Sequence, residues 1–205
     1  MPRRLLLVLV LVAVVALAAA LPSGAGAAPT LGVNAAGVPA GAALDEALAS
    51  GAREVRMFLL WRDLEAQGKG RLEPGLVAAY TDIVARLSAA GVRANFVFTT
   101  SPQWASGSSN PHTPPRNPAD YADALARFAA LPGIAGKGIA YEIWNEEDAD
   151  EWWAPKADAA AYAALVKAAA PALRAADPTA EVVLGPLTGS DFPFLESLYA
   201  QGVQG

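Results

Sequence analysis

AYEIWNEE, residues 140–147, is the stretch of sequence that indicates the fold of this chain. It begins with Tyr141 and Ile143, residue types that favour strands, and it ends in an amide and two carboxylates. Acidic groups are costly to bury, so a strand that ends in them leads to a polar site or to solvent. In a parallel α/β barrel the carboxyl ends of the strands carry the active site. The stretch therefore predicts either a site at a strand end or a core strand that runs into a solvated acidic loop.

Apolar runs of strand length alternate with amphipathic segments of helix length on both sides of this stretch. The spacing predicts strands at residues 30–34, 54–61, 92–99, 138–144 and 181–185, and helices at residues 42–50, 76–90, 119–130, 158–176 and 192–201. Strict alternation of strand and helix implies right-handed crossovers and one parallel sheet. An open doubly wound sheet and a closed (β/α)8 barrel both have this pattern.

The residues that follow the strands favour the barrel. The turn after the first strand, residues 34–39, lacks the G-x-G-x-x-G loop of a dinucleotide-binding sheet. Aromatic and acidic residues instead follow successive strands, at residues 61–63, at Trp104 and at residues 144–147. A barrel takes about 250 residues, and this sequence stops within the fifth helix. We therefore predict the α/β class and a (β/α)8 TIM barrel that is truncated after about five β/α units.

The first residues have the pattern of an export signal. Arg3 and Arg4 precede an apolar run at residues 5–21, and Ala25-Gly26-Ala27 fits a small-residue cleavage site. We expect residues 1–27 to be a signal peptide and residues 28–205 to be a secreted, partial barrel domain without stable membrane insertion after cleavage. The alternative is an uncleaved anchor, because the apolar run is near the shortest length that spans a bilayer.

Composition excludes several classes of function. The formal net charge of −5 leaves no basic stripe to neutralise phosphates, so we expect no nucleic-acid partner. The absence of cysteine removes disulfides and thiolate metal sites. A single histidine, His112, gives little support to a histidine metal site or a Ser-His triad. We therefore expect neither a metal nor a cofactor.

Three strand ends of this chain resemble those of the retaining glycoside hydrolases of clan A. These are the (β/α)8 enzymes that include the cellulase-like family 5 and the xylosidase-like family 39. The resemblance is carried by Val55-Arg56 with Trp61 at the second strand, by TSPQWA (residues 100–105) after the third, and by W-N-E (residues 144–146) at the fourth. A W-N-E sequence at the end of the fourth strand of a β/α series is a specific signal.

The resemblance implies a role for five residues. Glu146 would be the general acid/base, Asn145 would bind the sugar 2-hydroxyl, and Arg56 would orient the nucleophilic carboxylate. Trp104 and Trp144 would line the sugar pocket. The implied activity is hydrolysis of O-glycosyl bonds in a poly- or oligosaccharide. The residue types fit this chemistry, because a glycosidic oxygen is a poor leaving group unless an acid protonates it.

The chain also departs from the clan pattern. Glu147 and Asp148 stand where clan members have proline or a small residue. The clan nucleophile is a glutamate at the end of a seventh strand, which this sequence lacks, so the chain as given is expected to be inactive. The alternatives are a non-catalytic carbohydrate-binding barrel and a structural α/β domain with an accidental W-N-E. The coding sequence downstream of Gly205 separates the enzyme from the binding module.

Several other residues keep two interpretations. Glu142 either pairs with Arg56 inside the barrel or faces solvent, since it lies four residues before Glu146 on the same strand face. Trp152 and Trp153 either contact substrate or pack. His112 is expected at the rim. The acidic run at residues 146–151 lacks the spacing of a calcium loop and is expected to be solvated.

Overall fold

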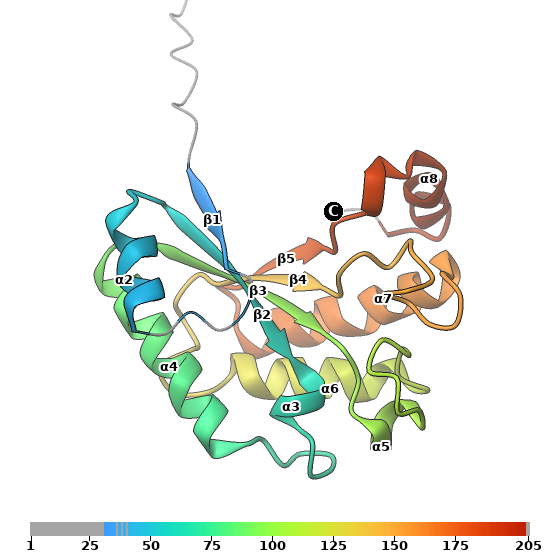
Figure 1. Cartoon of the computed structure of the whole chain (residues 1–205). Coiled ribbons are helices and arrows are strands. Elements are labelled where there is room, and N and C mark those ends of the chain that lie inside the picture. Colours follow the sequence, from blue (N-terminus) through green and yellow to red (C-terminus); the bar gives the residue numbers. More distant parts are fainter. Residues whose placement is uncertain (1–30, 36, 38, 40, 204–205) are drawn as a thin grey trace, which may run out of the picture. The chain divides into compact units, whose positions relative to one another are not determined.

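A computed structural model describes residues 31–35, 37, 39 and 41–203 (Figure 1). The predicted signal peptide and its cleavage site lie outside this part of the chain, so export stays a prediction. The strands are β1 (Gly32–Asn34), β2 (Glu54–Leu60), β3 (Arg93–Thr99), β4 (Ala140–Ile143) and β5 (Glu181–Leu184). The helices are α2 (Ala42–Ala49), α3 (Trp61–Leu64), α4 (Pro74–Ala89), α5 (Gln103–Ser106), α6 (Pro118–Ala129), α7 (Ala159–Ala176), the 3-10 turn η1 (Thr188–Ser190) and α8 (Phe192–Ala200).

The five strands form one parallel sheet in the order β1-β2-β3-β4-β5, which is also their order along the chain. This is the arrangement of successive units in a (β/α)8 barrel, and a doubly wound sheet would reverse direction at a switch point. The predicted partial TIM barrel is therefore confirmed. Among the helices of the described residues, none has the length and apolarity that a bilayer crossing requires.

The two faces of the sheet differ in polarity. Along β2, Val55, Met57 and Leu59 are fully buried under the helices, whereas the alternate residues point to the opposite, concave face. Figure 1 shows α4, α6 and α7 together on one side of the sheet. Charged residues of β2 and β4, Arg56 and Glu142, lie on the concave face, where their register neighbours are Asn95 and Val97. The sheet thus presents a polar surface that a closed barrel would enclose.

The predicted strands and long helices all occur, with ends that shift by one or two residues. Three of the helices begin with proline within their first two positions, where the missing N–H is not needed. Asp158 caps α7 by accepting from Ala160 N at 2.9 Å and Ala161 N at 3.0 Å. The short helices α3 and α5 were not predicted, because four residues are too few to show helical periodicity.

A tyrosine from the helix that follows each of three strands is hydrogen-bonded to the end of that strand. Tyr80 of α4 donates to Phe58 O in β2 at 2.8 Å. Tyr121 of α6 donates to Phe98 O in β3 and accepts from Trp144 N, just beyond β4, at 3.2 Å. These buried hydroxyls satisfy backbone groups where the strand ladder stops, which fixes the strand ends that carry the loops.

Tyr162 of α7 makes the same connection between β4 and β5. Its hydroxyl donates to Ile143 O at 2.7 Å and accepts from Gly185 N at 2.9 Å. We expect Tyr162→Phe to lower the free energy of unfolding by about 1–3 kcal/mol, because two buried backbone groups lose their partner. Tyr199→Phe is the matched control, since Tyr199 is 50% exposed. Urea unfolding of both variants measures the difference, and equal stabilities would show that the hydroxyl contributes nothing.

Candidate functional site

Arg56 forms the centre of a hydrogen-bond network on the concave face. Its Nε lies 2.9 and 3.0 Å from the two carboxylate oxygens of Glu142, and its Nη2 lies 2.7 Å from Oε2. Glu142 Oε1 also accepts from Asn95 Nδ2 at 2.9 Å. This resolves the two interpretations of Glu142, which pairs with Arg56 and is buried. A planar guanidinium bound to a carboxylate in this forked manner is rigidly oriented.

The same guanidinium orients two amides. Arg56 Nη2 donates to Asn145 Oδ1 at 2.9 Å, and Nη1 donates to Asn34 Oδ1 at 3.2 Å. Because the oxygen of Asn145 is bound to Arg56, its Nδ2 is the end that is left to donate to a ligand. Arg56 therefore presents the Asn145 amide group as a hydrogen-bond donor at the carboxyl end of the sheet.

The backbone turns sharply where β4 ends. Trp144 has φ 73° and Glu146 has φ 53°, and the neighbouring strand β3 is followed by Thr100 with φ 67°. Positive φ is uncommon in residues other than glycine and costs on the order of 1–3 kcal/mol, so the surrounding structure must hold it. Two bonds do so: Trp144 Nε1 donates to Trp152 O at 2.7 Å, and Glu146 N donates to Pro186 O at 3.0 Å. Strain of this kind gathers at functional sites.

A pocket of about 280 Å³ opens at this end of the sheet. Its lining includes Asn34, Arg56, Thr100, His112, Asn145, Glu146 and Trp152. The structure thus brings together Arg56, Asn145 and Glu146, which the sequence placed on two strands. Of the described lining residues, Glu146 alone carries a carboxylate. The roles of these residues stay predictions, because no ligand contact tests them.

Trp104 and Trp144 do not line this pocket, contrary to expectation. Trp144 is fully buried, because the reversed backbone turns its ring to the packed interior beside Tyr121 and Trp153. Trp104 donates Nε1 to Glu65 O at 2.8 Å and packs against another ring rather than facing the pocket. The expectation that Trp104 and Trp144 line the pocket is therefore corrected for the pocket of the described residues.

Trp152 is the tryptophan that lines the pocket. Its ring meets that of His112 edge to face, with centroids 4.6 Å apart. Burial, and then the charge of Arg62, lower the pKa of His112 below its ordinary value, which favours the neutral ring at pH 7. Nothing in the sequence favours Trp152 over the other tryptophans, because its position depends on the loop after β4.

Two carboxylates of the acidic run at residues 146–151 hydrogen-bond to groups of the surrounding loops. Asp148 accepts from Thr188 N at 2.9 Å and from Thr188 Oγ1 at 2.8 Å, which ties the loop after β4 to the loop after β5. Asp150 accepts from Ala157 N at 2.9 Å. No group of three or more side chains suited to a metal ion occurs within the described residues. The run was expected to be solvated, but Asp148 and Asp150 instead accept hydrogen bonds from backbone amides of the loops.

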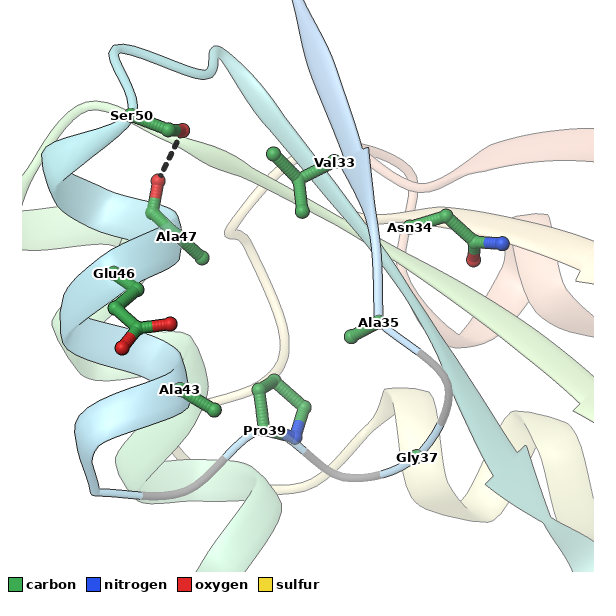
Figure 2. A pocket seen from close by; sticks show the side chains of 9 residues that line it. All are labelled: Val33, Asn34, Ala35, Gly37, Pro39, Ala43, Glu46, Ala47 and Ser50. Atoms are coloured by element: carbon green, nitrogen blue, oxygen red, sulfur yellow. Dashed lines mark hydrogen bonds between the residues drawn. The ribbon is translucent and has the colours of Figure 1, made fainter.

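A larger cavity, of about 400 Å³, lies between β1 and α2. Figure 2 shows Val33 and Ala35 pointing toward α2, while Asn34 points to the other face of the sheet. The lining of this 400 Å³ cavity is mostly small and apolar, and Glu46 is the one charged side chain among the described residues that border it. We place the candidate site at the smaller pocket, where the polar network and the reversed backbone meet.

Comparison with known proteins bears on the fold of the chain. No protein-family model matches the chain, and no curated protein matches it. Solved structures do. Endo-glycoceramidase II from a Rhodococcus species is 18% identical with a TM-score of 0.60, and the match covers 78% of this chain and 49% of that chain. A family 39 glycoside hydrolase from Bacteroides cellulosilyticus is 19% identical with a TM-score of 0.55, covering 75% and 31%.

A third structure is an exo-β-1,4-mannosidase from an Opitutaceae bacterium, 18% identical with a TM-score of 0.56, and the match covers 76% of this chain and 31% of that chain. The chain shares the fold of the matched part of these three glycosidases. The resemblance inferred from the strand ends is confirmed at this level. The chain spans about a third to a half of the length of these three glycosidases.

Proposed function

We propose that this chain supplies the acid/base side of a glycoside hydrolase active site that acts on a poly- or oligosaccharide by retention. The observation that carries the proposal is the Arg56 network, which presents the Asn145 amide beside Glu146 in one pocket at the carboxyl end of a barrel sheet. The fold of the neighbouring glycosidases supports it.

In this proposal Glu146 protonates the glycosidic oxygen and later activates water. Asn145 Nδ2 donates to a hydroxyl of the sugar ring, an interaction that strengthens as the oxocarbenium-like transition state develops. Retention also needs a second carboxylate about 5–5.5 Å from the first. The described pocket holds only Glu146, so we assign the nucleophile to a part of the whole protein outside these residues.

The test is hydrolysis by the product of the whole reading frame that encodes these residues. Aryl glycosides of the common pyranoses and gluco-, manno- and xylo-oligosaccharides form the panel, and proton NMR follows the anomeric configuration of the first product. Hydrolysis with retention supports the proposal, and inversion contradicts it. Binding without hydrolysis would instead favour a carbohydrate-binding barrel, the alternative that the single carboxylate of the described pocket supports.

A second prediction concerns which tryptophan meets the sugar. Trp152→Ala is expected to weaken binding of the best ligand of the panel by about tenfold, because it removes a half-buried ring from the pocket lining. Trp104→Ala is the control and is expected to lower stability, with little change in affinity, because its ring packs on Trp61. Calorimetric titration measures both. A larger loss of affinity in the Trp104 variant would restore the expectation drawn from the sequence.

A further inference from the structure

Glu147 is a fully buried carboxyl group whose two oxygens have no well-aligned hydrogen-bond partner among the described residues. The other three buried carboxylates of the described residues are provided with donors, and the Glu142 network is described above. Glu65 accepts from Trp61 Nε1 at 2.8 Å and from Gly70 N, and Asp177 accepts from two backbone amides and a threonine hydroxyl. A buried ionised carboxylate without donors is costly. The surroundings of Glu147 therefore do not suit the charged form.

The carboxyl group of Glu147 packs directly on the backbone that follows β5. A Cβ placed on Gly185 would lie 2.2 Å from Glu147 Oε2 and 3.0 Å from Glu147 Cδ. Only glycine at residue 185 leaves room for the acid. Glu147 is thus enclosed between the ends of β4 and β5, immediately after the residue proposed as the acid/base.

The hydroxyl that faces this carboxyl is an acceptor. Tyr162 has one proton, which it donates to Ile143 O, and one of its two lone pairs accepts from Gly185 N. The Tyr162 hydroxyl lies close enough to Glu147 for each to act on the pKa of the other. The lone pair that remains on Tyr162 can accept a proton from a neutral Glu147, but the hydroxyl has no proton left for a carboxylate.

Burial is the largest influence on the pKa of Glu147 and raises it from its ordinary 4.5 to about 8. A backbone hydrogen bond of Glu147 and a hydrogen bond with Tyr162 act against this increase, whereas the charges of Asp148 in its own loop and Glu142 in β4 add to it. On α6, the hydroxyl of Tyr121 donates its proton to Phe98 O, so it has no proton to give to Glu147.

We propose that Glu147 is a positioning residue for Glu146, acting as a neutral acid that donates to the free lone pair of Tyr162. Tyr162 already joins the ends of β4 and β5 to α7. The proposed contact would add the residue that follows Glu146 to this junction and so hold the left-handed backbone of Glu146. The role of Glu146 in hydrolysis rests on the proposed function, whereas the neutral state of Glu147 does not. Ionisation of Glu147 would remove its proton from this contact, so the position of Glu146 would change in mildly alkaline solution.

The sign of the effect on stability follows from the two pKa values. Glu147 keeps its proton in the folded chain up to about pH 8, whereas the unfolded chain loses it above about pH 4.5. Folding therefore takes up a proton between these values, and stability is lost as pH rises through that window. Below it both states are protonated, and above it both are ionised, so the difference becomes constant.

The first experiment measures unfolding of the chain in urea between pH 4.5 and 9, for wild type, Glu147→Gln and Glu151→Gln. Glutamine resembles the neutral acid and does not titrate. We expect the unfolding constant of wild type, relative to Glu147→Gln, to rise by up to tenfold per pH unit until about pH 8 and then level off. Glu151→Gln, an exposed change in the same loop, is expected to show no such trend. A flat ratio for Glu147→Gln overturns the proposal.

A second experiment uses spectra of the wild-type chain, so its infrared part needs no variant. Infrared difference spectra of the wild-type chain are expected to show a protonated carboxyl band that disappears near pH 8. The amide NMR signal of Glu146 should move with the same midpoint in wild type and should not move in Glu147→Gln. A Glu147 that titrates without moving the Glu146 signal would be a structural residue only, and the positioning role would be wrong.

These readouts separate the two proposals. They require neither substrate nor turnover, so they hold or fail whatever Glu146 does. If Glu147 titrates as expected while Glu146→Gln hydrolyses glycosides normally, the proposed function fails and the positioning role of Glu147 remains. If hydrolysis depends on Glu146 while Glu147 titrates as an ordinary glutamate, only the positioning role fails.

Discussion

Replacing Glu146 with glutamine in the product of the whole reading frame is expected to lower kcat on unactivated glycosides by at least about 10²-fold, the usual size of a lost general acid. The amide keeps the shape of the side chain and its place in the pocket, but it cannot transfer a proton to the leaving oxygen. Substrates with an acidic phenol as leaving group should lose least in the first step, because they need little protonation. Initial rates on a series of aryl glycosides measure this dependence.

Glu151→Gln is the matched control, since it removes an exposed carboxylate from the same loop and should leave the rate nearly unchanged. Equal losses on activated and unactivated substrates in Glu146→Gln would mean that Glu146 does something other than protonate the leaving group. Added azide offers a further check. A small anionic nucleophile needs no general base, so it should restore turnover of activated substrates in the variant.

The parts of the site that the sequence predicted are those that depend on strand order and strand ends. Parallel strands bring their carboxyl ends to one edge of the sheet. A β/α series therefore predicts that Arg56 in the second strand lies near Asn145 and Glu146, which follow the fourth. Only the structure decides between the two interpretations of Glu142. The alternation of a strand predicts the face on which a side chain lies, but it does not predict which residue of another strand that side chain contacts.

The parts that could not be predicted depend on local reversals of the chain. The positive φ of Trp144 turns its ring into the core, a conformation that strand alternation does not anticipate for a tryptophan. The loop after β4 brings Trp152 to the pocket in its place. The acidic composition of residues 146–151 predicts a solvated Glu147, and this prediction is wrong, because the side chain is fully buried. The residue type of Glu147 does not indicate whether the folded chain surrounds it with groups that suit the neutral acid.

The polar network also explains why a charged pair lies inside the sheet. Arg56 and Glu142 occupy two strands that are not neighbours, because β3 lies between them, and the pair spans β3 at the level of Asn95. A network of this kind fixes the relative positions of the strand ends on which Asn34 and Asn145 are carried. Stability and the geometry of the site therefore depend on the same guanidinium.

Arg56→Met is accordingly expected to lower the free energy of unfolding by about 3 kcal/mol, because it leaves the Glu142 carboxylate, only 8% exposed, without its cation. Arg93→Met is the matched control. Arg93 in β3 also pairs with two carboxylates, Glu54 in β2 and Glu181 in β5, but its side chain is 41% exposed, and its loss should cost less than about 1 kcal/mol. Urea unfolding at pH 7 measures both variants.

Adding Glu142→Gln to Arg56→Met should recover most of the lost stability, because no buried charge is then left unpaired. The double variant should still bind glycosides poorly, since Asn145 no longer has the guanidinium that fixes which end of its amide faces the pocket. Recovery of both stability and affinity would show that Arg56 serves the fold alone. Equal destabilisation by Arg56→Met and Arg93→Met would instead show that burial of the pair has no energetic consequence.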